Sequence, residues 1–167
     1  MPASPVTIRD ATERDLPAIL AIYNDAVRHS TAIWSVDEID VEDRRAWWQL
    51  RRSAGYPVLV AEVGLQTLAY GSFAQFRPFD GFRYTVEHSV YVAAGHRRQG
   101  LGSLLLGELI HRARVAGMHV MVAGVDASNT ESLRLHARFG FTEVARMPEV
   151  GRKFDRWLDL VFLQLCL

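Results

Sequence analysis

The sequence has a single cysteine, Cys166, next to the last of its 167 residues. One cysteine cannot form a disulfide within the chain, and no Cys/His cluster has the spacing of a zinc site, so no metal is expected. No apolar run approaches the roughly 18 residues that a membrane-spanning helix needs. The first ten residues also lack the basic start and apolar run of a signal peptide. These absences predict a soluble, cytoplasmic protein with no membrane partner.

The chain also has no excess of charge of either sign. Lys+Arg and Asp+Glu both total 19, which gives a formal net charge of zero. This balance argues against binding of nucleic acid through a broad basic surface, but it does not exclude a local anion site. The length suits one domain, 1–167, and 49% hydrophobic residues are enough for a sizeable core.

Hydrophobic periodicity predicts alternating helices and strands in this domain. Helices are predicted over 16–29 and 41–53, from the two glycines at 100 and 102 to Gly117, and from a capping box of Ser128 and Glu131 to Phe139. Strands are predicted over 6–11, 58–63, 67–75, 85–92, 119–125, 141–147 and 156–167. The segment between the last two strands is expected to be a loop. Antiparallel hairpins beside a strand–helix–strand crossover indicate an α/β fold with a mixed sheet flanked by helices.

Two glycines, Gly100 and Gly102, stand where the third helix begins, and Arg97 and Arg98 precede them. Amides at a helix N-terminus bind phosphate, glycine leaves room for the ligand, and arginine adds forked donors. The site is not a P-loop, because no lysine followed by Ser/Thr comes after the second glycine. It is not a dinucleotide fingerprint either, because Leu105 occupies the third glycine position. The alternative is a tight turn with solvated arginines.

A longer set of segments is similar to one family of enzymes. Arg97-x-x-Gly100-x-Gly102, after the strand HSVYV, resembles the acetyl-CoA pyrophosphate loop of the GCN5-related N-acetyltransferases. In chain order, LAIYNDAV, TAIW, FDGFR, TVEHSVYV, HVMVA, LH, GF and VGRKFDRWLDL resemble the phosphinothricin and methionine sulfoximine N-acetyltransferase subfamily. The resemblance covers nearly the whole chain.

This resemblance implies transfer of an acetyl group from acetyl-CoA to a primary amine. It also implies a mostly antiparallel sheet whose two central parallel strands splay apart. Pantetheine amides would pair with exposed backbone groups of the first of these strands, as an added strand. Asn129 matches a family position near the pantetheine, or it is an ordinary helix-start residue. The cofactor-binding residues so implied are Val90, Val92, Arg97, Arg98, Gly100, Leu101, Gly102, Ser103, Asn129 and Ser132.

An amine is protonated near neutral pH, so its attack on a thioester needs a base, and the oxyanion needs donors. Glu87 matches the glutamate of the family's TVE segment and is the first candidate base; the alternative is a solvated strand residue. His136 matches a subfamily histidine and is the second candidate, as base or as acid toward the thiolate; the alternative is a packed or surface histidine. Many relatives in the wider superfamily use a tyrosine on that helix, but no tyrosine follows Tyr91. His88 alternates to the face opposite Glu87 and is expected to be structural.

An amino-acid substrate needs a cation for its carboxylate. Arg77 and Arg83 in the loop 76–84 are candidates, Arg77 first because a subfamily cation recurs there; each is otherwise a surface charge. Phe76 replaces the tryptophan that the resemblance predicts at its position. The aromatic residues expected to line or cover the amine pocket, or else to pack in the core, are Trp34, Phe76, Phe79 and Phe82.

The sequence therefore predicts an N-acetyltransferase for the α-amine of a small amino-acid analogue. Methionine sulfoximine and methionine sulfone are the leading substrates, with phosphinothricin after them. Two alternatives stay open: acetylation of another small amine or a protein N-terminus, and a non-catalytic acetyl-CoA-binding sensor. The family commonly dimerises, which implies a homodimer formed through the C-terminal strand or the segment 147–157.

Overall fold

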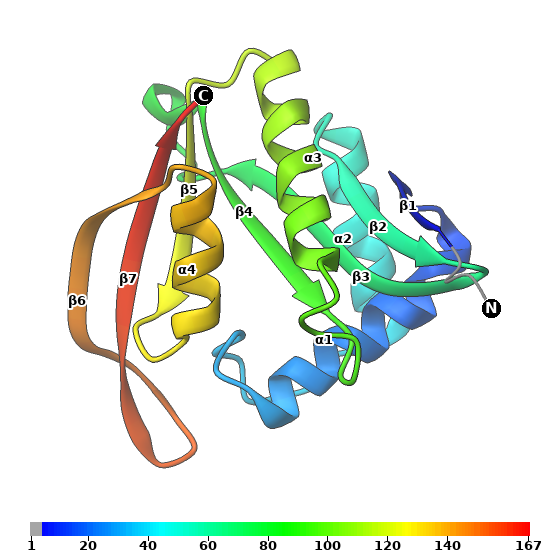
Figure 1. The fold of residues 1–167 in the computed structure, drawn as a ribbon, viewed down its shortest axis with the longest axis horizontal. Coiled ribbons are helices and arrows are strands. Elements are labelled where there is room, and N and C mark those ends of the chain that lie inside the picture. Colours follow the sequence, from blue (N-terminus) through cyan, green and yellow to red (C-terminus); the bar gives the residue numbers. More distant parts are fainter. Residues whose placement is uncertain (1–4) are drawn as a thin grey trace.

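Seven strands form one sheet in the order β1-β2-β3-β4-β5-β7-β6 in the computed structural model, which describes residues 5–167 (Figure 1). The strands are β1 (Val6–Asp10), β2 (Val58–Val63), β3 (Gln66–Gln75), β4 (Thr85–Val92), β5 (Val120–Asp126), β6 (Thr142–Lys153) and β7 (Arg156–Cys166). Among the strands of residues 5–167, only the β4–β5 pair is parallel. The predicted mixed, mostly antiparallel sheet is therefore confirmed.

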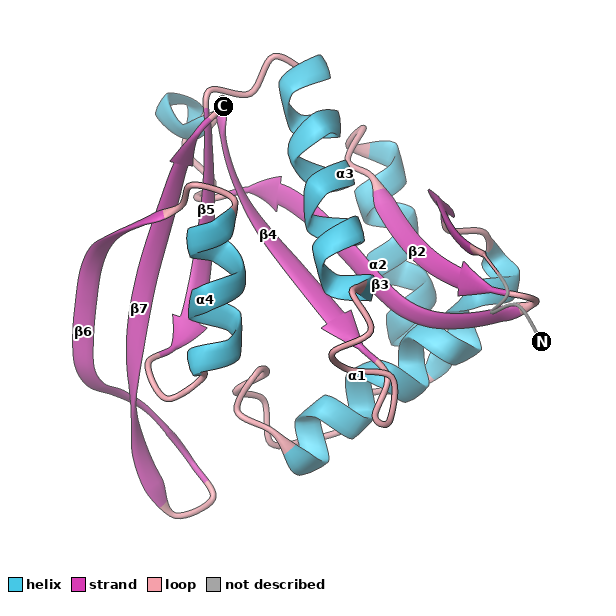
Figure 2. Cartoon of the chain, in the orientation of Figure 1, coloured by secondary structure: helices cyan, strands magenta, loops and turns pink. Residues whose placement is uncertain are grey.

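Four α-helices cover the two faces of this sheet. They are α1 (Leu16–His29), α2 (Val41–Ser53), α3 (Leu101–Val115) and α4 (Thr130–Arg138), with short 3₁₀ turns at Glu13–Asp15 and Asp80–Phe82. Helices α3 and α4 lie in front of the sheet in Figure 2, and α1 and α2 lie behind it. Within residues 5–167, no helix is both long and apolar enough to cross a membrane.

The period of two along a strand explains why both faces are covered. In β2, Leu59 and Ala61 belong to the core cluster beneath α3, whereas Val58 and Val60 belong to the cluster formed with α1 and α2. All four side chains are buried, so this strand has no solvent-facing side. A nearly continuous apolar run is the sequence pattern expected for such a strand.

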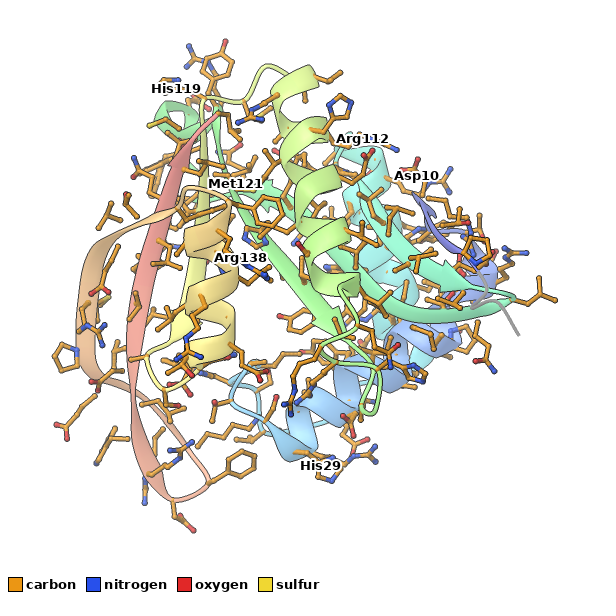
Figure 3. The ribbon with its side chains drawn as sticks, in the orientation of Figure 1. Asp10, His29, Arg112, His119, Met121 and Arg138 are labelled. Carbon is orange, nitrogen blue, oxygen red and sulfur yellow. The ribbon has the colours of Figure 1, made fainter. Side chains whose placement is uncertain are left out.

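Helix α3 is also tied to the far edge of the sheet by charge. The guanidinium of Arg112 lies 3.1 Å from the carboxylate of Asp10 on β1 and 2.8 Å from that of Glu108, one turn earlier in the helix (Figure 3). These exposed pairs add little stability individually. Both pairs lie on the C-terminal half of α3. The N-terminal end of the helix lies near the open end of β4.

Two predictions about local structure were wrong. The segment predicted as a loop after residue 147 is part of β6, which continues to Lys153 with a register shift after Met147. Phe154 and Asp155 then form a two-residue turn with φ values of 51° and 56°. Such left-handed turns normally carry Asn-Gly or Asp-Gly, and a phenylalanine in the first position with no glycine after it is not a turn signal.

The start of the last helix was also misplaced. Its N-cap is Asn129, whose side-chain oxygen accepts a 3.1 Å hydrogen bond from the Ser132 amide. Ser128 instead bonds the Asp126 carboxylate through both its amide and its hydroxyl, at 2.9 Å each. Both Ser128 and Asn129 are good capping residues, and the aspartate at the end of β5 decides between them.

Candidate active site

Strands β4 and β5 diverge after a short parallel ladder. They pair only over 85–87, opposite 120–122. Beyond that point β4 stays beside β3 as far as Val92, and β5 stays beside β7 as far as Asp126 (Figure 1). The predicted splay between the two central parallel strands is therefore confirmed.

The edge of β4 beyond the splay presents free peptide groups toward β5. The Tyr84 carbonyl accepts a 2.8 Å hydrogen bond from the chain leading into β5, whereas the Thr85 carbonyl accepts one of 3.0 Å from the chain end of β3. Because peptide groups alternate in direction along a strand, those of Val90 and Val92 face the β5 side. An extended amide-containing ligand can pair with such an edge.

The head of α3 lies directly beyond this edge. Gly100 is the N-cap with φ at 83°, a left-handed conformation that glycine adopts at little cost. The amides from Leu101 to Ser103 have no partner within the helix and carry the positive end of its dipole. Arg97 and Arg98 are exposed on the preceding turn. The arrangement suits an anion bound against backbone amides.

The second glycine of the motif needs a different explanation. Gly102 lies inside the helix, where glycine is about 1 kcal/mol less favourable than alanine. A Cβ at this position would meet only ordinary contacts, 3.7 Å from side-chain atoms of Leu135 and Val92. Neither backbone conformation nor protein packing requires glycine here, so an approaching ligand is the remaining reason for it.

The start of α4 faces the same opening from the other strand. Asn129 and Ser132 are half-buried and joined by the capping hydrogen bond described above. That bond occupies the side-chain oxygen of Asn129 in its helix-start role. Arg98 reaches toward this helix, with its Nε 3.6 Å from the carboxylate of Glu131. The head of α3 and the start of α4 thus flank the splay.

Glu87 is the last β4 residue that pairs with β5, and its carboxylate lies over β5. A Cβ on Gly124 would lie 3.2 Å from Oε1 of Glu87. Burial raises the pKa of Glu87, and the nearby positive charge of Arg77 partly opposes that rise. A half-buried carboxyl with a raised pKa at the edge of a strand opening has the properties of a general base.

His136 lies on the opposite face of the sheet and bonds His88. Its Nε2 is 3.0 Å from Nε2 of His88, and its Nδ1 is 2.7 Å from the Ser132 carbonyl. A carbonyl only accepts, so the neutral His136 ring is protonated on Nδ1 and accepts at Nε2 from His88. Burial lowers the pKa of both rings, that of His88 to about 3. The pair is therefore neutral at ordinary pH, and Glu87 and His136 do not lie together.

The aromatic loop before β4 meets β7 beside Glu87. The Phe76 ring packs edge-on against Phe82 at 5.8 Å and against Phe162 of β7 at 6.0 Å, measured between ring centroids. The guanidinium of Arg77 lies 4.2 Å from the centre of the Phe76 ring. Of the two candidate cations, Arg77 is therefore the one placed near Glu87.

The side chains of three other predicted pocket residues are not grouped with Glu87. Phe79 is 67% exposed, and Arg83 covers the Tyr84 ring at 4.8 Å and bonds the Asp80 carbonyl. Trp34 packs against Gly151 of β6, where a Cβ would come within 2.2 Å of its ring. The structure thus groups Phe76 and Arg77 with Glu87, but neither Phe79 nor Arg83.

Sequence reasoning missed Phe162 and Gly124. Both lie on the face that carries Glu87, and both are set there by the register of β5 against β7, which pairs Gly124 with Phe162. Alternation along the last strand places Phe162 on one face, but which face meets Glu87 depends on that pairing. The sequence signal for Gly124 is a glycine interrupting an apolar strand, which often marks a close approach.

A splayed parallel pair, a free strand edge and a helix head suited to an anion fit an acyltransferase that holds an extended thioester cofactor. The model of the Acetyltransferase (GNAT) family matches residues 18–141, and the chain belongs to this family. Its fold, its enzyme class and its acyl donor, acetyl-CoA, are as predicted.

Individual relatives are similar over nearly their whole length. An L-methionine sulfoximine/L-methionine sulfone acetyltransferase of Salmonella typhimurium is 54% identical over 96% of this chain and 94% of its own. An acetyltransferase of the same organism, yncA, solved with its cofactor acetyl-CoA, is 54% identical, with a TM-score of 0.96 over 98% of this chain and 95% of its own. A ribosomal-protein-alanine N-acetyltransferase from Brucella melitensis is 51% identical, with a TM-score of 0.95 over 96% and 99%.

Proposed function

We propose that this enzyme acetylates the α-amine of small amino acids whose side chain ends in a tetrahedral polar group. L-methionine sulfone and L-methionine sulfoximine are the leading substrates, and phosphinothricin follows. The observation that carries the proposal is the half-buried Glu87 carboxylate at the splay, with Arg77 close enough to affect its pKa. A base and a cation side by side suit a substrate with both an amine and a carboxylate.

The cofactor supplies an activated acetyl thioester, and the chain supplies its position. The pyrophosphate would lie on the amides from Leu101 to Ser103, with Arg97 and Arg98 as charged partners. The pantetheine would pair with the peptide groups of Val90 and Val92. Asn129 and Ser132 would line the other side of the same channel. Neither backbone conformation nor packing requires the glycine at position 102. This supports the placement, because the glycine leaves room above the helix head.

Glu87 would take the proton of the substrate ammonium, directly or through water, so that the nitrogen lone pair can attack the thioester carbon. As the C–N bond forms, the carbonyl oxygen becomes negative, and an amide of the free β4 edge near Val92 would donate to it. As the C–S bond breaks, the acylated nitrogen would give up its second proton to become a neutral amide, and the departing thiolate would take up a proton in its place. The guanidinium of Arg77 would hold the substrate carboxylate, with Phe76 and Phe162 as apolar walls.

An assay of thiol release from acetyl-CoA across a panel of amines tests this function. We expect methionine sulfone and sulfoximine to give kcat/KM values at least about tenfold above those of methionine, because a sulfone or sulfoximine head offers acceptors that a thioether lacks. Equal rates for all amines would contradict the proposed selectivity. Tight binding of acetyl-CoA without turnover of any amine would instead favour a sensor.

A second substrate class is a protein N-terminus, favoured by the similarity to the ribosomal-protein-alanine N-acetyltransferase. A peptide substrate has no free carboxylate near its amine, so it would not need Arg77. A peptide with N-terminal alanine in the same assay separates the two classes. Faster turnover of that peptide than of methionine sulfone would reverse the ranking.

We also propose that the protein is a homodimer formed through the β6–β7 hairpin. β6 is an edge strand, and five large apolar side chains along this hairpin and its turn are exposed, an unusual surface for a monomer. They are Val144, Met147, Val150, Phe154 and Trp157. Light scattering should give about twice the chain mass of 18.8 kDa.

A further inference from the structure

The segment after α1, residues 30–34, lies between the ends of β4 and β5 (Figure 1). On the β4 side, Ile33 is buried in a small cluster with Val27 that packs against Tyr91. On the β5 side, burial raises the pKa of Asp126, while the nearby Thr31 and Ser128 hydroxyls help to lower it below its ordinary value. The segment thus bridges the two strands beyond the point where they part.

Lys153, at the end of β6, anchors this segment. Its ammonium donates to the carbonyls of Ser30 at 2.8 Å and Ile33 at 2.5 Å, and the side chain is buried. It is the only lysine of the sequence, whose other basic side chains with a permanent charge are all arginine. An ammonium carries three donors on one nitrogen, so a single atom can donate to two backbone carbonyls of one tight segment.

A second contact from β6 holds the same segment. The Trp34 ring packs against Gly151, and a Cβ there would come within 2.2 Å of the ring. The Trp34 indole N–H donates to the Thr31 carbonyl at 2.9 Å, which closes the segment on itself. Gly151 lies within a strand and is not among the residues with positive φ. Its lack of a side chain is therefore explained by the contact with Trp34.

We propose that Lys153 and the Trp34–Gly151 contact are positioning elements that hold residues 30–34 as a fixed wall of the amine pocket. This inference rests on the proposed function, because it assigns that wall to the side-chain end of the amine substrate. Neither element touches the reacting atoms. Loosening them should weaken recognition of the amine and leave acetyl-CoA binding at α3 intact.

The first test compares Lys153→Met with Arg152→Met. Arg152 is next to it on the same hairpin but is exposed and paired with Asp155, so its variant loses the same charge without touching the segment. With methionine sulfone as the amine, Lys153→Met should raise the amine KM about tenfold, a typical effect of slight misplacement. The acetyl-CoA KM should change by less than about twofold, and Arg152→Met should alter neither constant. An unchanged amine KM in Lys153→Met would overturn the proposal.

The second test keeps the ammonium and displaces Trp34. Gly151→Ala should reproduce the selective rise in amine KM, whereas Gly107→Ala, where a Cβ would meet Phe139 at an ordinary 3.5 Å, should not. If Lys153→Met fails to fold, Gly151→Ala alone decides the question. Equal acetyl-CoA and amine effects in Gly151→Ala would indicate a general structural role and refute the proposal.

A readout without turnover separates this inference from the proposed function. Lys153 is the only side-chain amine, so labelling with an amine-reactive acetic ester, followed by mass spectrometry of its peptide, reports the exposure of one group. Labelling should be slow in the wild-type protein and faster in Gly151→Ala. Equal labelling rates would refute the inference. An inactive wild-type enzyme that shows the expected labelling difference would refute only the proposed function.

Discussion

Glu87 combines three features that a general base needs: partial burial, a position at the splay and a raised pKa. Glu87→Gln keeps the size of the side chain and removes its ability to accept a proton. We expect kcat to fall about 10²- to 10³-fold at neutral pH, with little change in acetyl-CoA binding. Steady-state kinetics measures kcat, and titration calorimetry with coenzyme A measures binding of the cofactor.

The role of Glu87 as a base also predicts the direction in which kcat/KM changes with pH. Wild-type kcat/KM should fall as the pH is lowered through the raised pKa of Glu87, because the protonated carboxyl cannot act as a base. Glu87→Gln should lose that limb of the profile. Glu143→Gln is a suitable control, since Glu143 lies on β6 and pairs with Arg146 at the surface. An unchanged rate and profile in Glu87→Gln would exclude this residue as the base.

In helix α3, Gly102 is expected to lower the stability of the protein and to favour the binding of acetyl-CoA. Gly102→Ala should raise the free energy of unfolding by up to about 1 kcal/mol, because alanine favours the helix and meets only ordinary contacts. The same methyl group would occupy the space above the helix head and weaken acetyl-CoA binding. Thermal melting and calorimetry measure the two effects. Gly107→Ala, later in the same helix, should stabilise without weakening binding; a stabilised Gly102→Ala that binds acetyl-CoA normally would contradict the ligand explanation.

The elements that the sequence predicts well are those with local signals. Gly100 marks the start of α3 and Gly117 its end, and both have positive φ in the structure. The turn at Phe154–Asp155 has no such signal, because its left-handed residues are neither glycine nor asparagine. That turn is stabilised by the pairing of β6 with β7, which local propensity does not contain.

The candidate site likewise has features that the sequence predicts and features that depend on tertiary contacts. Position along the chain places Glu87 on the strand before the anion-binding turn, and this was predictable. The contacts that the Glu87 side chain makes, to Gly124 and near Arg77, depend on strand register between distant segments. Lys153 meets Ile33, and Gly151 meets Trp34, only because the hairpin folds back over the segment after α1. The sequence therefore predicts which residues carry the chemistry of the site. The residues that they contact are determined by the tertiary fold.

The two histidines link the sheet to α4 and make the stability of the whole molecule depend on pH. His88 and His136 have pKa values below the ordinary 6.5 because burial disfavours their charged forms. Above pH 6.5 both folded and unfolded chains keep them neutral. Below pH 6.5 the unfolded chain binds protons that the folded chain does not, so stability falls as the pH falls, by about 1.4 kcal/mol per pH unit for each fully neutral ring.

Glu87 acts in the opposite direction within the same range. Its pKa is raised in the folded protein, so between 4.5 and that raised value the folded chain binds more protons, and stability increases as the pH falls. The lowered pKa of Asp126 matters only below about pH 4. Urea unfolding between pH 7.5 and 4.5 should therefore show a steeper loss of stability in Glu87→Gln than in wild type, because the substitution removes the compensating proton. His111→Gln, at an exposed position on α3, should leave the slope unchanged. Equal slopes in wild type and Glu87→Gln would mean that the Glu87 carboxyl is not desolvated in the folded protein. A flat profile in both would mean that the histidine pair takes up protons in the folded protein as readily as in the unfolded chain.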